Sequence, residues 1–111
     1  MSVVGDKYRE LLESRKQIEE VDYDNDPTIK EMIKVLTNNI DETIDYIKND
    51  CSAEEFIYIS ELYDDIVDIT KSKAFIDCLY EVAKKYPKEV EEYNIMNFIN
   101  WASNHLDERE N

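Results

Sequence analysis

The chain has 111 residues, 42% of them hydrophobic and 11% aromatic, and a formal net charge of −14 from 27 acidic residues against 13 Lys and Arg. This length is typical of one domain, and the hydrophobic content suffices for a core, which argues against a disordered chain. We therefore expect a single helical domain over residues 1–111. Nucleic-acid phosphates and anionic lipids are themselves negative, so we expect no nucleic acid and no membrane as a partner.

The counts of glycine, proline and cysteine narrow the fold class. With 1 Gly and 2 Pro there are few residues for the tight turns of β-hairpins, which favours an all-α fold. The 2 cysteines, Cys51 and Cys78, form no CxxC motif, and the first residues, MSVVGDKYRE, lack the apolar run of a signal peptide. We expect reduced thiols in a cytoplasmic protein without a cofactor.

The negative charge is concentrated in the middle of the chain. Residues 21–70 hold fourteen Asp or Glu against three Lys, a balance of −11, whereas residues 1–20 balance at −1 and residues 71–111 at −2. A field of one sign destabilises a small domain by self-repulsion but steers an oppositely charged partner. A basic protein is therefore the expected partner.

The first predicted helix runs from about Asp6, its N-cap, to about Glu20. An acidic, turn-rich linker is expected over residues 21–26. Apolar residues at a spacing of three or four predict which face of the helix is buried. That face carries Tyr8, Leu11, Leu12, Arg15 and Ile18.

The second predicted helix begins at Asp26-Pro27, because an N-cap Asp followed by Pro at the first position is a typical helix start. Its helical spacing continues to about Asp50. The pair Asn38-Asn39 is an expected break. The sequence is therefore compatible with one long helix over this segment and also with two short helices. The apolar face carries Ile29, Ile33, Leu36, Ile40, Ile44 and Ile47.

The third predicted helix spans about residues 53–69. It follows a capping box, Ser52-Ala-Glu-Glu55, in which the Ser hydroxyl and the Glu carboxylate each satisfy a backbone N–H group of the first turn. The residues that we expect this helix to bury are Phe56, Ile59, Leu62, Tyr63, Ile66 and Ile69.

Two further helices complete the expected fold. The fourth begins at Thr70 or Ser72 and ends near Tyr86, because helices rarely continue through the residue before a proline. An acidic turn, KEVEEY, follows Pro87, and Asn94 caps the last helix over about residues 95–106. About five to six short-linked amphipathic helices imply an antiparallel bundle or a HEAT-like stack of hairpins. The expected inward residues are Ile76, Leu79, Ala83 and Tyr86, then Ile95, Phe98, Ile99, Ala102 and Leu106.

Asp22, Asp24 and Asp26 match the first three ligand positions of a calcium-binding EF-hand loop. The rest of that loop does not match, since Pro27 stands at the invariant glycine and Ile33 at the bidentate glutamate. The helix start at Asp26-Pro27 explains the segment equally well. We expect no metal site here.

A second group of carboxylates lies on the third predicted helix, where Glu61, Asp64, Asp65 and Asp68 have ExxD and i,i+4 spacings, with Glu54-Glu55 upstream. This pattern resembles the magnesium-binding helices of all-α nucleotide pyrophosphohydrolases of the MazG type. The EExxE element of that family is missing, because Tyr58 stands at its last position. A magnesium-dependent hydrolase is therefore the alternative to a binding protein.

The single histidine, His105, excludes His-rich metal sites, and we expect it to be partly exposed near a helix end.

An acidic stripe on the third helix is the candidate partner surface. Its increments of 4, 3, 4 and 3 place five residues on one helical face, with one further acid alongside. An ordinary solvated face and a binding surface with an aromatic anchor both fit this pattern. The stripe consists of Glu54, Tyr58, Glu61, Asp65 and Asp68, with Asp64 beside it.

Trp101 lies off the apolar face of the last helix. A large aromatic residue is usually at least partly buried, so we favour a position at the core edge, and the alternative is an exposed anchor. Trp101 and the linker residues Asp22 and Asp24 are further candidate partner-binding residues.

The run EEFIYISELYDDIVDITKSKAFIDCLYEVAKKYPKEV, followed by NIMNFINWA, resembles small all-helical immunity proteins of bacterial polymorphic-toxin and contact-dependent growth inhibition systems. The resemblance covers about residues 40–106 and consists of helix caps and core positions. It implies a cytoplasmic protein that binds its cognate toxin domain, commonly a basic nuclease, and blocks the active site or substrate entry. The acidic charge agrees with this reading. An acidic adaptor or regulatory subunit for another basic partner stays open.

Overall fold

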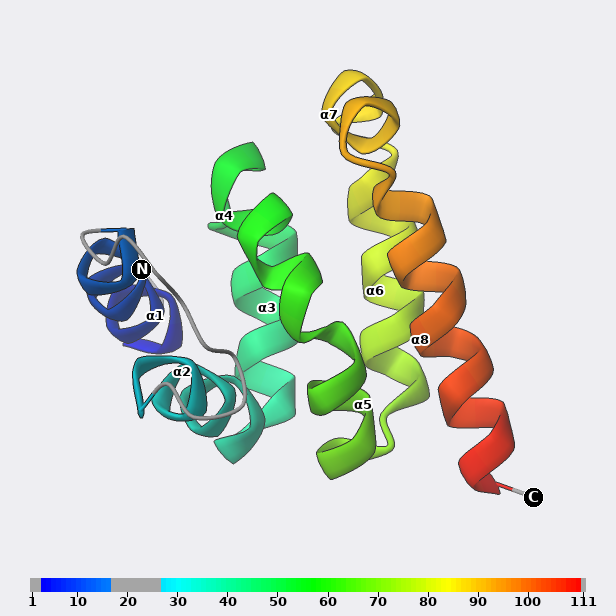
Figure 1. Cartoon of the computed structure of the whole chain (residues 1–111), viewed down its shortest axis with the longest axis horizontal. Coiled ribbons are helices and arrows are strands. Elements are labelled where there is room, and N and C mark those ends of the chain that lie inside the picture. The colour runs from blue at the N-terminus through cyan, green and yellow to red at the C-terminus, as the bar shows by residue number, and fades with distance from the viewer. Residues whose placement is uncertain (1–2, 17–26, 111) are drawn as a thin grey trace.

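The computed structural model describes residues 3–16 and 27–110, with side chains up to residue 106. All regular structure in these ranges is helical, which confirms the all-α class (Figure 1). The α-helices are α1 (Val3–Lys16), α2 (Pro27–Asn38), α3 (Ile40–Asn49), α4 (Ala53–Ile59), α5 (Tyr63–Thr70), α6 (Lys73–Ala83), α7 (Pro87–Glu92) and α8 (Ile95–Glu110), with a 3₁₀ segment η1 (Ser60–Leu62) between α4 and α5.

The helices pack in two layers of antiparallel hairpins. In one layer α1 contacts α3 and α3 contacts α6, and in the other α2 contacts α5 and α5 contacts α8. The pairs α1–α2 and α6–α8 join the layers, and α7 lies across one end, against α4 and α8. Figure 1 shows the hairpins side by side in chain order, from α1 and α2 at one edge to α6 and α8 at the other.

One continuous apolar core lies between the two layers. Burial of apolar surface is the main favourable term in folding, and aromatic residues supply much of it here. Tyr63 is 1% exposed and packs against Phe56 and Phe75, with ring centroids 6.2 and 6.1 Å away. The largest fully buried side chains are Tyr8, Tyr46, Tyr63, Phe56, Phe75, Met32, Leu36, Ile47, Ile59, Leu62, Ile66 and Leu79.

The first half of the chain follows the predicted helices with one difference, at the start of α1. α1 begins at Val3, so Asp6 lies in the first turn and is not the N-cap. The break at Asn38-Asn39 is present, and the Asn39 side chain caps α3 by accepting a hydrogen bond from the Glu42 N–H at 3.3 Å. The predictions for Ile18 and for residues 21–26 fall outside the described residues.

The predicted helix over residues 53–69 is divided in three. Ser60 is buried, and its hydroxyl donates to the Ile57 carbonyl at 2.5 Å, a bond that competes with regular helix geometry. The chain therefore passes through the 3₁₀ segment, which shifts the phase of the following helix. α5 buries Ile66 and Val67, so the prediction that Ile69 is buried was wrong: this residue is 59% exposed.

The acidic stretch after Pro87 is helical. Pro87 occupies the first turn of α7, where its fixed φ suits a helix start and its missing N–H costs nothing. The prediction of a turn over KEVEEY was therefore wrong. Asn94 has φ of 55° and lies between Tyr93, the C-cap of α7, and α8. In this left-handed conformation Asn94 ends α7 and does not take the extended geometry of an N-cap, which corrects the prediction for α8.

Candidate functional site

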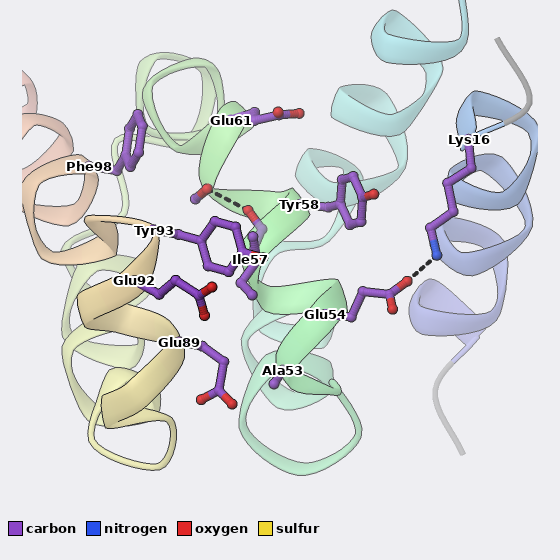
Figure 2. Close-up of a pocket in the computed structure, with 11 residues that line it drawn as sticks. Lys16, Ala53, Glu54, Ile57, Tyr58, Glu61, Glu89, Glu92, Tyr93 and Phe98 are labelled. Carbon is purple, nitrogen blue, oxygen red and sulfur yellow. Dashed lines mark hydrogen bonds and ion pairs between the residues drawn. The ribbon is translucent and has the colours of Figure 1, made fainter. Parts of the chain in front are cut away.

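A groove lies between α1, α4, η1, α7 and α8. Its volume is about 810 Å³, within the range of ligand-binding clefts. It combines carboxylates with aromatic and aliphatic side chains (Figure 2). The residues that line this groove are Lys16, Ala53, Glu54, Ile57, Tyr58, Ser60, Glu61, Glu89, Glu92, Tyr93 and Phe98.

α4 forms the floor of the groove. The Ser52 side chain caps α4 by accepting a hydrogen bond from the Glu55 N–H at 3.2 Å, as the capping box predicts. The Glu55 carboxylate does not return to the Ser52 N–H, because it accepts from the Ser52 hydroxyl at 2.8 Å instead. With the start of α4 held in this way, Glu54 and Tyr58 lie one helical turn apart and face the groove.

α1 forms the first wall, and its last two residues bring positive charge to the acidic floor. The Lys16 ammonium donates to the Glu54 carboxylate and lies 5.4 Å from the centroid of the Tyr58 ring. Arg15 Nη2 lies 2.9 Å from Glu61 Oε2, and the Arg15 guanidinium carbon is 5.5 Å from the same ring centroid. The hydrogen bond to Glu54 raises the pKa of Lys16, against a smaller lowering by desolvation, so Lys16 is protonated at neutral pH.

α7 forms the opposite wall. Glu89 and Glu92 are three residues apart and therefore share one face of this helix, and Tyr93 follows at its C-cap. Within the described ranges neither Glu89 nor Glu92 forms an ion pair, in contrast to Glu54 and Glu61 on the α1 side. Figure 2 shows this difference, with the bond between Lys16 and Glu54 on one side and the two α7 carboxylates on the other.

The side chains that line the groove carry four carboxylates and one ammonium. Aromatic rings lie among these charges, at Tyr58, Tyr93 and Phe98. Such a surface attracts cations by charge and offers ring faces over which an ammonium or guanidinium group can bind. The arrangement can therefore accommodate an ammonium or guanidinium group.

Only half of the predicted acidic stripe belongs to this groove. Glu54, Tyr58 and Glu61 line it, whereas Asp64 and Asp65 are exposed on α5 and do not. The 3₁₀ segment explains the separation, because the stripe assumed one uninterrupted helix.

Asp68, the last residue of the stripe, faces α8. Its Oδ1 lies 2.5 Å from His105 Nε2, and both side chains are partly buried. His105 is therefore partly exposed, as predicted, but it contacts α5 and is not at a helix end, since α8 continues to Glu110.

Trp101 is 57% exposed, so the favoured prediction of a core-edge position was wrong. Its ring packs edge-on against Phe98, with the centroids 5.4 Å apart. Phe98 itself lines the groove, which places Trp101 next to its α8 rim. Asp22 and Asp24 lie outside the described residues.

The carboxylates proposed for a magnesium site do not converge. Among the described residues no group of three or more His, Cys, Asp or Glu side chains could hold a metal ion. The carboxylates of the hydrolase alternative lie on three segments, α4, η1 and α5, because the 3₁₀ segment interrupts the predicted helix. Two of them, Glu54 and Glu61, are paired with basic residues of α1. No observation on these residues favours the hydrolase over a binding protein.

The α7 wall differs from the sequence-based prediction. That prediction places Glu89, Glu92 and Tyr93 in a turn and therefore gives them no common helical face. Two signals could have revealed it: Pro87 suits the first position of a helix, and Lys, Glu and Val at the following positions permit one. The Lys16 side of the groove could not be found in this way, because Lys16 and Glu54 are 38 residues apart.

In comparisons with known proteins, no family model, curated protein or solved structure matches this chain. The resemblance to immunity proteins therefore stays a prediction. No helix in the described ranges has the length and apolar character needed to cross a membrane.

Proposed function

We propose that this protein is an immunity protein that binds a cognate bacterial toxin domain, a basic nuclease, and neutralises it by covering the active site or the substrate groove. The observation that carries this proposal is the groove between α1, α4 and α7, which four carboxylates line, two of them paired with Lys16 and Arg15 of α1. A nuclease binds nucleic-acid phosphates through Lys and Arg, so an acidic inhibitor competes for the same side chains. Inhibition of this kind needs no catalytic residue in the inhibitor.

Aromatic residues in and beside the groove support tight binding, in addition to the electrostatic steering of a basic partner by the carboxylates. Tyr93 and Tyr58 line the groove, and Tyr93 is 50% exposed. Trp101, which packs on Phe98 at the α8 rim, is 57% exposed. Tyr and Trp are enriched among interface residues that dominate binding energy. In this proposal charge sets the association rate and the aromatic residues slow dissociation.

The test is charge reversal on the α7 wall, Glu89→Lys with Glu92→Lys, in cells that co-express the toxin domain. The matched control is Asp64→Lys with Asp65→Lys, which makes the same change in net charge at two neighbouring exposed carboxylates of α5 outside the groove. The α7 reversal should abolish protection, slow association and flatten its dependence on salt, whereas the α5 reversal should preserve protection. The opposite pattern would place the interface on α5 and remove the groove from the proposal.

A truncation tests the aromatic contribution. Tyr93→Ala should weaken binding by about 2 kcal/mol or more if Tyr93 is a central anchor, mainly through faster dissociation. Met96→Ala is a suitable comparison, because Met96 is also exposed, at 40%, on the neighbouring helix α8 but does not line the groove. Equal, small effects of both substitutions on the dissociation rate would show that Tyr93 is not an anchor.

A further inference from the structure

The cation position over Tyr58 is already occupied by the protein's own side chains. Lys16 Nζ lies 5.4 Å and Arg15 Cζ 5.5 Å from the centroid of this ring. Carboxylates stand on both sides, with Glu54 paired to Lys16 and Glu61 paired to Arg15. A ring face between two carboxylates is an arrangement that suits an ammonium or guanidinium group, and the two resident side chains here carry these groups.

The two resident cations differ in how firmly they are held. The Arg15 side chain is 9% exposed and its neighbours on α1 are part of the core. The Lys16 side chain is 29% exposed, and that of its partner Glu54 is 62% exposed. Exposed ion pairs are weak because water and salt screen them, and a lysine side chain has many rotamers available when released. Lys16 can therefore leave Tyr58 while Arg15 stays.

We propose that Lys16 occupies the place of a lysine or arginine side chain of the partner, which binds over Tyr58 and beside Glu54 after displacing Lys16. This inference rests on the proposed function and specifies the chemistry of its interface. The groove continues from this position to Glu89, Glu92 and Tyr93 on α7. A basic segment of the partner thus places one cation over Tyr58 and the next ones against α7, and Lys16 acts as an internal competitor that disfavours weakly basic proteins.

The test uses a synthetic peptide of alternating arginine and glycine as the probe, titrated against the purified protein at low salt. Lys16→Met removes the competitor and keeps an apolar stem, and it should bind the peptide about two- to five-fold more tightly than the unaltered protein, the range expected for release of one exposed ion pair. Lys16→Arg restores a resident cation and should return the affinity to that of the unaltered protein. Lys30→Met is the control for net charge, because Lys30 is exposed on α2 and does not line the groove. The affinity of this variant for the peptide should not rise.

A second substitution assigns the gain to the position over Tyr58. Glu54→Gln in the Lys16→Met background should remove the gain, because the peptide's cation then lacks its carboxylate partner. Equal affinities of the unaltered protein and Lys16→Met, with binding still lost on reversal of Glu89 and Glu92, would overturn the role of Lys16 and leave the proposed function standing. Absence of peptide binding by every variant would overturn both. Melting curves of each variant verify that the fold is intact.

Discussion

The Tyr46 hydroxyl donates a hydrogen bond to Glu55 Oε1 at 2.5 Å, which joins α3 to the start of α4. The same carboxylate oxygen accepts a hydrogen bond from Arg9 Nε on α1 at 2.9 Å. The Tyr46 ring is fully buried, and the Glu55 side chain is 15% exposed. Burial raises the pKa of Tyr46, with further contributions from Cys51 and Glu55, so this hydroxyl remains a donor at neutral pH. Glu55 therefore holds three helices together at the base of the groove.

We expect Glu55→Ala to lower the free energy of unfolding by about 1.5–3 kcal/mol, because it removes charge-assisted hydrogen bonds and leaves the buried Tyr46 hydroxyl without its acceptor. Glu54→Ala is the control, since the exposed pair between Glu54 and Lys16 should contribute under about 1 kcal/mol. Urea unfolding of both variants measures the difference. Equal losses at the two adjacent positions would contradict a special role for Glu55.

Gly5 should not tolerate a side chain. A Cβ atom at this position would lie 2.5 Å from Tyr46 Cδ1 and 2.7 Å from Cε1, although alanine is otherwise favoured over glycine in a helix by about 0.5–1 kcal/mol. Because the Tyr46 ring is packed in the core, we expect Gly5→Ala to destabilise the protein by about 1–3 kcal/mol. Ser14→Ala, on the exposed side of α1, should stay within about 0.5 kcal/mol. Thermal melting of both variants distinguishes steric overlap from helix propensity.

Lys71 is a position where glycine should stabilise the fold. It ends α5 with φ of 50° and ψ of 37°, a left-handed conformation that costs a residue with a Cβ atom about 1–2 kcal/mol. Glycine avoids this cost but loses more backbone entropy on folding, so we expect a net gain of about 0.5–1 kcal/mol for Lys71→Gly. Lys84 ends α6 with φ of −68°, so Lys84→Gly makes the same charge change and should give a loss. A gain at both positions in chemical denaturation would contradict the conformational explanation.

Alkaline pH should destabilise the protein through its buried thiols. Burial raises the pKa of Cys51 to about 12 and that of Cys78 to about 11, from an ordinary value of 9.0. Above pH 9 the unfolded chain releases these protons while the folded chain keeps them, so the free energy of unfolding falls as pH rises. Each thiol lowers the free energy of unfolding by up to about 1.4 kcal/mol per pH unit. This decrease stops when the thiol ionises in the folded protein as well, near pH 11 for Cys78 and near pH 12 for Cys51.

The measurement is the melting temperature as a function of pH for the unaltered protein and for Cys51→Ala with Cys78→Ala. The double variant should begin to lose stability about one pH unit later, because burial also raises the pKa of several tyrosines whose ordinary value is 10.0, among the described residues Tyr8, Tyr46, Tyr63 and Tyr86. Identical onsets in the two proteins would show that the thiols do not cause the alkaline loss.

Local signals in the sequence determined most of the helices. Ser52 caps α4 as predicted, and Ser72, one of the two residues predicted to begin the fourth helix, caps α6. Asn39 caps α3 at the position where the sequence predicts only a break. The spacing of apolar residues likewise predicts the buried face of α8 and part of that of α6, where Phe75, Cys78 and Val82 are buried in addition. These features depend on residues within one or two turns of each other, so they can be read without knowledge of the fold.

The tertiary structure decided which of the predicted site residues act together. Glu54, Tyr58 and Glu61 were predicted as part of a longer stripe, but the 3₁₀ segment separates them from the acids of α5. Whether Ser60 interrupts the helix depends on its burial and on its bond to Ile57, which the local sequence pattern does not reveal. The extent of the candidate surface was therefore not predictable from helical spacing alone.

The composition of the groove depended on the tertiary structure in the same way. The contacts of Lys16 with Glu54 and of Arg15 with Glu61 join residues that are distant in the chain, and packing of α1 against the rest of the fold brings them together. The sequence alone determined the helical class, the strong acidity and the presence of Tyr58 among carboxylates. Only the fold decided that a resident cation covers this tyrosine while the carboxylates of α7 remain open, because charge pairing between distant helices depends on distance in space and not along the chain.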